Sequence, residues 1–331
     1  MTVNTKVILA SRPKGFIEDK NFDIVTETLP ELNDGELLIS IEAISLDPAI
    51  RGWMNAGTTY IKGIELGAVM RTFSAGKVVQ SRHPSFKEGD VVSGLLGAQQ
   101  YCISDGSNLM RIDPSKSELS HHLGILGMPG MTAYFGLLEK GKPAVGDVVF
   151  ISGAAGIVGS TVGQIAKIKG CTVIGSAGND AKCHYLIREC GFDAAINYKT
   201  EDLDRKLKAY APEGVHIYYD NVGGPTLDIA LQNLARGSRV VICGAISQYN
   251  ATDMYGPKNY MKIVTARGTL SGIIVFDYVS EFSKAVRDIA NWIDSGQLAV
   301  KEHRVHGLEC FPDALRMLYT GENFGKLILT L

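Results

Sequence analysis

A glycine-rich segment, SGAAGIVGS at residues 152–160, has nearly the spacing of a loop that binds the phosphates of a dinucleotide. The three fixed positions of the fingerprint Gly-x-Gly-x-x-Gly are occupied here by Ala154, Gly156 and Gly159. The segment follows an apolar strand-like run and opens a helix-like run, and the N–H groups and dipole of such a helix start favour a pyrophosphate. Gly156 would let the backbone approach the phosphates, and Ala154 gives up only the tightest form of the turn. The alternative is an ordinary strand-to-helix turn made of small residues.

The end of the next strand bears on which dinucleotide would bind. An NAD enzyme usually places Asp or Glu there to hold the ribose hydroxyls, but residues 175–179 read GSAGN, without a carboxylate. Asp180 comes slightly late and is expected to be a helix N-cap. Lys182 follows in the first turn of that helix. A missing acid beside a cation favours a 2′-phosphate and therefore NADPH, whereas Lys182 on its own is equally consistent with a solvated surface lysine.

The composition is that of a globular chain with a substantial core. It has 331 residues, 45% hydrophobic and 21% charged, with a formal net charge of −2. That charge gives no reason to expect a nucleic-acid or membrane partner, and no apolar run reaches the roughly 18 residues that span a bilayer. The N-terminal apolar run is shorter than the core of a signal peptide, so we expect a cytoplasmic protein. The six scattered cysteines lack metal-ligand spacing, which predicts reduced thiols.

The two halves of the chain differ in their pattern of strands and helices. The segments 35–46, 69–81 and 89–104 are short, β-rich and punctuated by glycine, which predicts a partly open barrel or a sandwich. Further along, strand-like runs alternate with helical stretches such as 157–169 and 180–190, which predicts a doubly wound parallel sheet of the α/β class. The six runs are 147–152, 171–176, 194–197, 216–220, 238–243 and 269–275.

The C-terminal tail continues this pattern only briefly. A long helix is predicted at 280–293, a shorter one at 312–319 and a last strand at 325–331. The part after the long helix is too short to be a domain, so we expect it to return to the first domain.

Five motifs in order resemble those of the zinc-independent medium-chain dehydrogenase/reductases. They are GMPGMTAYFGLLE (127–139), SGAAGIVGSTVGQIAKIKGCTVIG (152–175), YYDNVGG (218–224), ICGAISQYN (242–250) and ENFGK (322–326). Within that family the chain is similar to the prostaglandin reductases and the curcumin reductases, a group that uses NADPH to reduce α,β-unsaturated ketones and aldehydes. The segments 6–15 and 46–54 resemble the bacterial curcumin reductases in particular.

The resemblance implies a division into domains. Residues 1–122 would form a GroES-like, β-rich catalytic domain, and residues 123–296 a Rossmann domain that binds NADPH. Residues 297–331 would return to the catalytic domain. The relatives also imply a homodimer.

The resemblance further implies which residues hold NADPH. The pyrophosphate loop is matched by Gly156, Ile157, Val158 and Gly159, the 2′-phosphate lysine by Lys182, and a tyrosine beside the adenosine phosphate by Tyr198. Positions around the nicotinamide half are matched by Asn221, Cys243, Gly244, Ala245, Ile246, Ser247, Tyr249, Ile273, Ile274, Val275 and Asn323.

Zinc-dependent relatives take metal ligands from a cysteine and a Gly-His-Glu triplet in the first domain. The corresponding places here, 45–52 and 63–70, contain neither Cys nor His. Zn²⁺ in such a site needs thiolate or imidazole ligands. We therefore expect no metal in the site.

Without a metal, reduction of an enone needs a hydrogen-bond donor where the enolate charge develops, and a proton for the α-carbon from a side chain or water. Tyrosine suits the first task because its hydroxyl stands at the end of a rigid ring. Tyr255 lies just beyond a loop expected near the nicotinamide, and Tyr60 lies in the first domain. We predict these two as the catalytic candidates.

Two other functions remain open at this point. One is a zinc-independent quinone oxidoreductase of the same superfamily, which would turn over quinones but not enones. The other is a non-catalytic NADPH-binding protein, which would bind the nucleotide without oxidising it.

Overall fold

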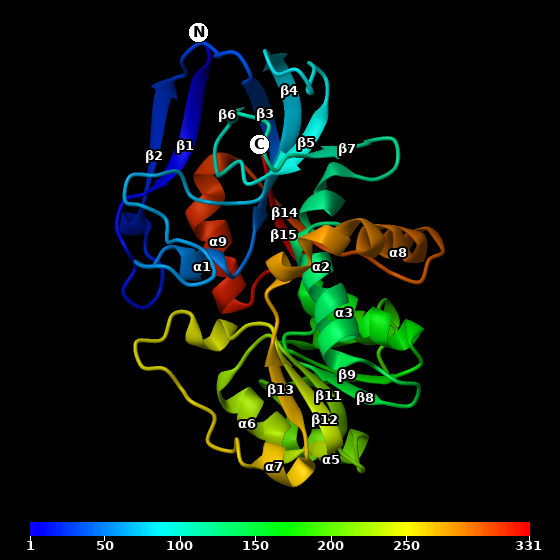
Figure 1. Ribbon diagram of the computed structural model, residues 1–331. Coiled ribbons are helices and arrows are strands. Elements are labelled where there is room, and N and C mark those ends of the chain that lie inside the picture. Colours follow the sequence, from blue (N-terminus) through cyan, green and yellow to red (C-terminus); the bar gives the residue numbers. More distant parts are fainter. The chain divides into compact units, whose positions relative to one another are not determined.

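The computed structural model describes all of residues 1–331, which divide into two units (Figure 1). Unit 1 comprises Met1–Gly124 together with Glu302–Leu331, and unit 2 comprises Ile125–Lys301. The sequence placed the corresponding boundaries after residues 122 and 296. None of the helices combines the length and the apolar character that a membrane span requires.

Unit 2 is built on a six-stranded sheet with the order β10-β9-β8-β11-β12-β13. Its strands are β8 (Val148–Ile151), β9 (Thr172–Ala177), β10 (Ala194–Asn197), β11 (Val215–Asp220), β12 (Leu234–Ile242) and β13 (Thr269–Gly272). Every neighbouring pair is parallel. The predicted doubly wound α/β sheet is confirmed, and all six predicted strands are present. Because the strands are parallel, the loops that follow them gather at one edge of the sheet.

The helices of unit 2 connect these strands. They are α2 (Met128–Phe135), α3 (Ile157–Ile168), α4 (Asp180–Arg188), α5 (Leu203–Tyr210), α6 (Gly224–Gln232), α7 (Lys262–Ala266) and α8 (Phe282–Asp294). Helix α2 packs against α3 and α8, while α6 packs against α5 and α7, so two groups of helices cover the sheet (Figure 1). Between the layers, the Phe150 ring stacks on Tyr218 with centroids 5.1 Å apart.

The last predicted strand of unit 2 is shorter than the sequence suggested. Strand β13 ends at Gly272, and the predicted residues up to 275 leave the sheet and enter a 3₁₀ turn, Val275–Glu281. The reason is that β13 is an edge strand paired only with β12, whose last paired residue, Ile242, lies opposite Gly272. Beyond that pair the strand has no partner.

Unit 1 contains a pair of antiparallel seven-residue strands, β1 (Val3–Leu9) and β2 (Phe22–Thr28). It also contains a larger mixed sheet of order β14-β15-β3-β4-β5-β7, with β6 also paired to β3. The strands of the larger sheet are β3 (Leu37–Leu46), β4 (Ser74–Ser81), β5 (Val91–Gly94), β6 (Tyr101–Ser104), β7 (Met110–Ile112), β14 (Glu302–His306) and β15 (Lys326–Thr330). Strand β15 is antiparallel to β3, with Leu327 opposite Leu46, so the C-terminal residues belong to this unit.

One segment of unit 1 differs in detail from its sequence pattern. The stretch 89–104 forms two strands, β5 and β6, because the chain turns between them at Gly97, whose φ is +78°. Helices α1 (Ile50–Trp53) and α9 (Phe311–Thr320) pack on the core of this unit, with Phe311 edge-on to Phe22 at 5.8 Å.

Candidate functional site

The glycine loop of unit 2 turns one residue earlier than the fingerprint suggests. Gly153, not Ala154, takes the left-handed conformation, with φ +59°. Ala154 is fully buried, and its N–H donates to the carbonyl oxygen of Ser176 at 3.0 Å, which fixes the loop on β9. The alanine therefore does not weaken the turn, because the residue before it supplies the backbone freedom. We expected Ala154 to give up the tightest form of the turn. The turn lies at Gly153 instead, so that expectation was wrong by one residue.

The start of helix α3 has no side-chain cap, unlike the two helices that follow. The N-cap of α3 is Gly156, whereas Asn179 caps α4 and accepts from the Lys182 N–H at 2.8 Å, and Asp202 caps α5. The first N–H groups of an α-helix have no partner within the helix. At α3 these are the groups at Ile157, Val158 and Gly159, so this end can donate to an external anion. Asp180, expected to be the cap of α4, is its first helical residue instead.

Two glycines of the loop meet different constraints. A Cβ on Gly159 would lie 2.7 Å from the Cα of Ala154, so the chain's own packing requires a glycine there. A Cβ on Gly156 would meet only the Gly153 carbonyl oxygen, at an ordinary 3.5 Å. Nothing within the protein requires glycine at 156. An open position beside uncapped helix amides fits a pyrophosphate that approaches the backbone closely.

A pair of lysines lies beyond the end of β9. The pKa of Lys182 is lowered, first by burial and then by the positive charge of Lys199. Lys199 and Tyr198 both reach over Gly178, where an added Cβ would lie 3.4 Å from Lys199 Cε and 3.1 Å from the Tyr198 hydroxyl. A bound dianion, such as a 2′-phosphate, would favour the charged form of Lys182.

Lys199 was not predicted from the sequence. It directly follows Tyr198, and β10 is the neighbour of β9, so the ends of these two strands meet at the same edge. Its position next to a predicted adenosine contact was the available signal. The Asp180 carboxylate nearby accepts from the Asn197 amide at 2.7 Å.

The loops expected around the nicotinamide half are bonded to each other at the ends of β11 and β12. The Asn221 amide nitrogen donates to the Ser152 carbonyl oxygen at 2.8 Å, and the Asn221 carbonyl oxygen accepts from Ile246 N–H at 3.2 Å. The Ser247 hydroxyl donates to the Val222 carbonyl oxygen at 2.6 Å. The structure thus brings Asn221 together with the predicted segment 243–249.

The other predicted residues of this segment complete the same edge. The Tyr249 hydroxyl oxygen accepts a hydrogen bond from Ala245 N–H at 3.3 Å. Burial raises the pKa of the Cys243 thiol to about 12, so this sulfur stays neutral at physiological pH. Ile273 N–H donates to the Ile242 carbonyl oxygen at 3.2 Å, which places the stretch 273–275 beside the start of the 243–249 loop.

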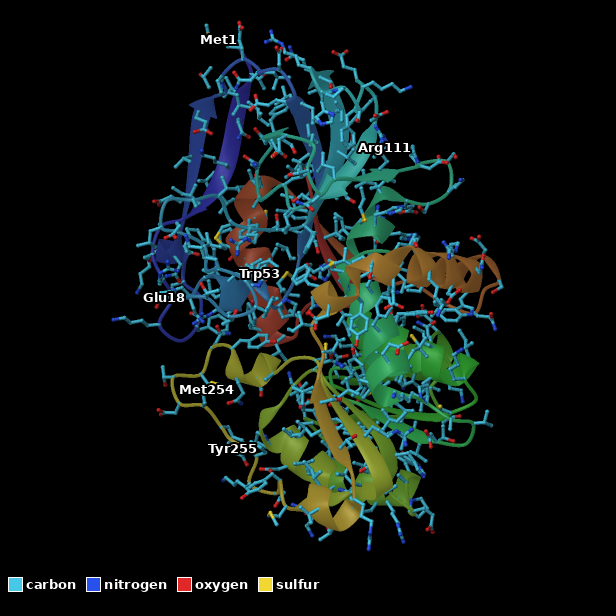
Figure 2. All side chains as sticks on the ribbon, viewed as in Figure 1. Met1, Glu18, Trp53, Arg111, Met254 and Tyr255 are labelled. Atoms are coloured by element: carbon cyan, nitrogen blue, oxygen red, sulfur yellow. The ribbon has the colours of Figure 1, made fainter.

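Tyr255 has its hydroxyl occupied inside unit 2. It donates to Asp228 Oδ2 at 2.7 Å, and Asp228 Oδ1 accepts the N–H groups of Lys258 at 2.8 Å and Asn259 at 3.0 Å. The hydrogen bond to Asp228 is the first cause that raises the pKa of Tyr255. Tyr255 thereby holds the 250–261 segment, labelled at Met254 and Tyr255 in Figure 2, against α6. A phenol has one proton to donate, so action on a substrate would require release from Asp228.

Two predicted residues lie in unit 1. The hydroxyl oxygen of Tyr60 accepts from the indole Nε1 of Trp53 at 3.0 Å, and its side chain is 49% exposed. Trp53, labelled in Figure 2, is itself buried and has the Arg71 guanidinium 5.9 Å from its ring centroid. Asn323 donates to the Gly325 carbonyl oxygen at 3.1 Å. No group of three or more His, Cys, Asp or Glu side chains in the structure is placed to hold a metal ion.

Comparison with known proteins shows the family of the chain. The family model described as "Zinc-binding dehydrogenase" matches residues 158–291, and the one described as "N-terminal domain of oxidoreductase" matches residues 5–112. The NADPH-dependent curcumin reductase of Escherichia coli is 36% identical over 98% of this chain and 96% of its own. The 2-alkenal reductase (NADP⁺-dependent) of Nicotiana tabacum is 38% identical over 98% of this chain and 97% of its own.

A solved structure shows the same fold throughout. The CurA protein of Vibrio vulnificus in complex with NADPH is 38% identical, covers 98% of both chains and superposes with a TM-score of 0.94. Identities of this size over nearly the whole length, together with the order of the motifs, show that the chain belongs to the medium-chain dehydrogenase/reductase family, in the group that contains the curcumin and alkenal reductases.

Proposed function

We propose that the protein uses NADPH to reduce the C=C bond of α,β-unsaturated ketones and aldehydes. The observation that carries the proposal is the start of α3, uncapped and open at Gly156, with the lysine pair Lys182 and Lys199 at the end of the neighbouring strand. Together these groups suit the pyrophosphate and the 2′-phosphate of one dinucleotide. The names of the relatives supply the substrate class: curcumin is an enone, and 2-alkenals are its aldehyde counterparts.

In this proposal the residues at the carboxyl edge hold and orient the cofactor. Gly156–Gly159 would bind the pyrophosphate, and Lys182, Lys199 and Tyr198 the adenosine phosphate. Asn221, the 243–249 loop and residues 273–275 would surround the nicotinamide. Asn323, in unit 1, stays a prediction from the family resemblance. When bound, NADPH supplies a hydride for the β-carbon of the substrate.

Negative charge then develops on the substrate's carbonyl oxygen, and a hydrogen-bond donor is needed there. We propose Tyr60 as that donor. The contact with the Trp53 indole supports this role, because a hydrogen bond to the phenol oxygen stabilises the charge that grows on it as its proton is shared. Tyr255 is the second candidate, and it would first have to leave Asp228. Water or a tyrosine would supply the proton to the α-carbon, and no metal ion would be involved.

The proposal is tested by following NADPH oxidation with a panel of enones, enals and quinones, with and without a chelator. We expect turnover of enones and enals that is insensitive to the chelator. Turnover of quinones alone would favour a quinone oxidoreductase, and binding without any turnover would favour a non-catalytic nucleotide-binding protein. Loss of activity with the chelator would overturn the metal-free chemistry. Tyr60→Phe with full activity would remove Tyr60 as the donor.

We also propose that two copies of the chain associate through the β13 edge of the sheet. Strand β13 has a neighbour on one side only, and Leu270 on it and Val264 on α7 are exposed apolar residues. Light scattering should then give the mass of a dimer for the natural chain and of a monomer for Leu270→Lys. A monomeric natural chain would overturn this assembly.

A further inference from the structure

Asp220 is a fully buried carboxylate in the middle of the sheet of unit 2. It is the last residue of β11, which lies between β8 and β12. An ionised carboxylate is expensive to bury and persists only where hydrogen bonds replace its hydration. Asp220 was not predicted from the sequence, and the chemistry proposed above does not use it.

One oxygen of this carboxylate accepts hydrogen bonds from four donors. Asp220 Oδ1 accepts from the Ser152 hydroxyl at 3.0 Å, the Tyr218 hydroxyl at 2.7 Å, Val222 N–H at 3.0 Å and Gly223 N–H at 2.9 Å. These donors come from the end of β8, from β11 and from the turn that follows β11. A single acceptor shared by four donors fixes their relative positions, so this oxygen sets the geometry of the turn.

The backbone of Asp220 extends the same network to the next strand. Its carbonyl oxygen accepts from Cys243 N–H at 2.9 Å and Gly244 N–H at 3.1 Å. The carbonyl oxygen of Val222, in the turn fixed by Oδ1, accepts both the N–H and the hydroxyl of Ser247. Asp220 therefore couples the ends of three adjacent strands to the 243–249 loop.

The turn after Asp220 leaves little tolerance for a shift. Gly223 has φ +68°, and a Cβ there would lie 2.9 Å from the Cβ of Ala245. The two loops thus touch at a position where even a methyl group does not fit. A displacement of the turn would be passed on to the 243–249 loop.

The second oxygen of the carboxylate makes no hydrogen bond. Asp220 Oδ2 is buried without a partner. An asparagine at this position would either bury its NH₂ group at that unpartnered site or turn it toward the four donors. Either orientation leaves a buried donor unsatisfied. The carboxylate is therefore not interchangeable with its amide.

From this network we infer that Asp220 is a positioning residue for the nicotinamide half of the cofactor. It acts through Asn221 and the 243–249 loop and does not touch the cofactor itself. The inference rests on the proposed function only in that these loops surround the nicotinamide. It does not depend on which substrate is reduced.

The test compares two ligands that share the adenosine half. Isothermal titration would measure the affinity of Asp220→Asn for NADPH and for 2′,5′-ADP, which carries the 2′-phosphate but no nicotinamide. We expect the affinity for NADPH to fall about tenfold, the effect of losing a hydrogen bond to a charged group, while the affinity for 2′,5′-ADP stays unchanged. The fluorescence of bound NADPH should also change, because it reports the surroundings of the nicotinamide.

A matched control and a milder variant keep the test decisive. Asp147→Asn changes another buried aspartate of the same sheet, outside the proposed site, and should alter neither affinity. If Asp220→Asn does not fold, Tyr218→Phe removes one of the four donors and should lower the affinity for NADPH alone, by about threefold. Equal losses for both ligands, or the same selective loss in Asp147→Asn, would overturn the inference. A chain that binds NADPH as expected but reduces no enone would overturn the proposed activity and leave this inference standing.

Discussion

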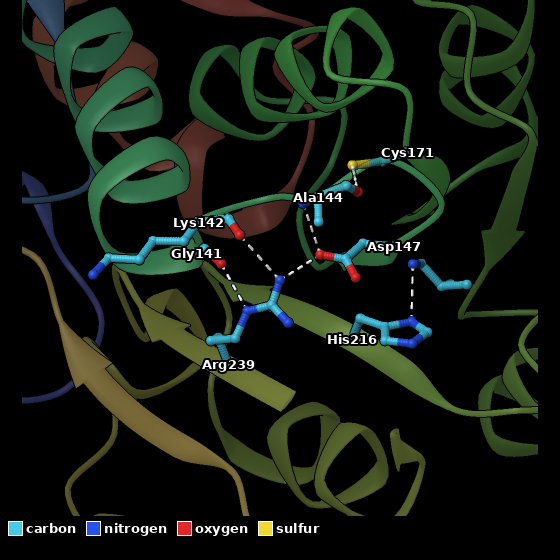
Figure 3. Close-up of polar contacts among 8 residues, drawn as sticks. Gly141, Lys142, Ala144, Asp147, Cys171, His216 and Arg239 are labelled. Atoms are coloured by element: carbon cyan, nitrogen blue, oxygen red, sulfur yellow. Dashed lines mark hydrogen bonds and ion pairs between the residues drawn. The ribbon is translucent and has the colours of Figure 1, made fainter. Parts of the chain in front are cut away.

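The two edges of the six-stranded sheet use their polar groups in opposite ways. At the amino edge, Arg239 at β12 is enclosed by acceptors: it pairs with the Asp147 carboxylate and donates to the carbonyl oxygens of Gly141 at 2.8 Å and Lys142 at 3.2 Å (Figure 3). Asp147 also accepts from Ala144 N–H at 3.0 Å. Each contact drawn there joins two groups of the chain itself.

At the carboxyl edge, the first N–H groups of α3 have no side-chain cap, and two lysines lie nearby. Gly156 leaves space beside that helix start, and burial together with the charge of Lys199 lowers the pKa of Lys182. The amino edge is thus satisfied by groups of the chain itself, whereas in the proposed function the carboxyl edge binds the phosphates of NADPH. Substitutions at the first edge should therefore change stability alone, and those at the second should change binding.

Arg239→Met should have the largest effect. It leaves the buried Asp147 and the carbonyl oxygens of Gly141 and Lys142 without their cation, which should lower the free energy of unfolding by about 3 kcal/mol. The affinity of the folded protein for NADPH should not change. Urea unfolding and a binding titration measure the two quantities, with the exposed Lys142→Met as a control. A loss of affinity in folded Arg239→Met would contradict the separation of the two edges.

Lys182→Ala makes the opposite test at the carboxyl edge. Loss of a charge-assisted contact with the 2′-phosphate should weaken NADPH binding by about 2 kcal/mol and leave NADH nearly unaffected. Lys208→Ala, which removes the same charge at an exposed position of α5, serves as the control. An unchanged preference for NADPH over NADH would mean that the 2′-phosphate is held elsewhere.

The sequence led to predictions about the carboxyl edge of the sheet and to none about the contacts at the amino edge. Strand and helix alternation is a local pattern, and it located all six strands. The glycines and Lys182 gave a prediction of where the phosphates bind. Single-residue choices were less certain: the turn falls on Gly153 and the cap on Asn179, each one position earlier than expected. Adjacent residues of suitable type can adopt the same backbone angles, so the sequence alone does not fix which of them forms the turn or the cap.

Contacts between distant segments were not predictable in this way. The Tyr255 hydroxyl meets Asp228, 27 residues earlier, and Arg239 meets Asp147, 92 residues earlier. Of the four donors to Asp220, Ser152 likewise lies 68 residues earlier, whereas the other three lie within three residues of it. These contacts depend on the order of the strands in the sheet, because that order decides which strand termini lie side by side. The strand-like runs in the sequence do not specify the order.

Two glycines of the loop, Gly159 and Gly156, are expected to differ in what they affect: the first stability, the second cofactor binding. Gly159→Ala should lower the free energy of unfolding by about 1.5 kcal/mol, because its Cβ would press on the backbone of Ala154. Gly156→Ala should leave stability within about 0.5 kcal/mol and weaken NADPH binding, because its Cβ occupies the space that the pyrophosphate would take. Thermal unfolding and titration distinguish the two. Equal effects of both substitutions on both quantities would show that the space at Gly156 is not a ligand site.

The smallest expected effect is the pH dependence of cofactor choice. Lys182 has a pKa below its usual value of 10.5 in the free protein, so it loses its proton earlier than an exposed lysine as the pH rises. The folded chain then binds fewer protons than the unfolded one, and NADPH, which needs the charged ammonium, should lose affinity relative to NADH at alkaline pH below 10.5. Lys199→Gln removes one of the two causes of the lowered pKa, so in that variant the decline should begin at higher pH, although overall affinity is weaker. Titrations with both nucleotides across this range measure the shift. An unchanged midpoint in Lys199→Gln would mean that burial alone lowers the pKa of Lys182, and that the two lysines do not act as one anion site.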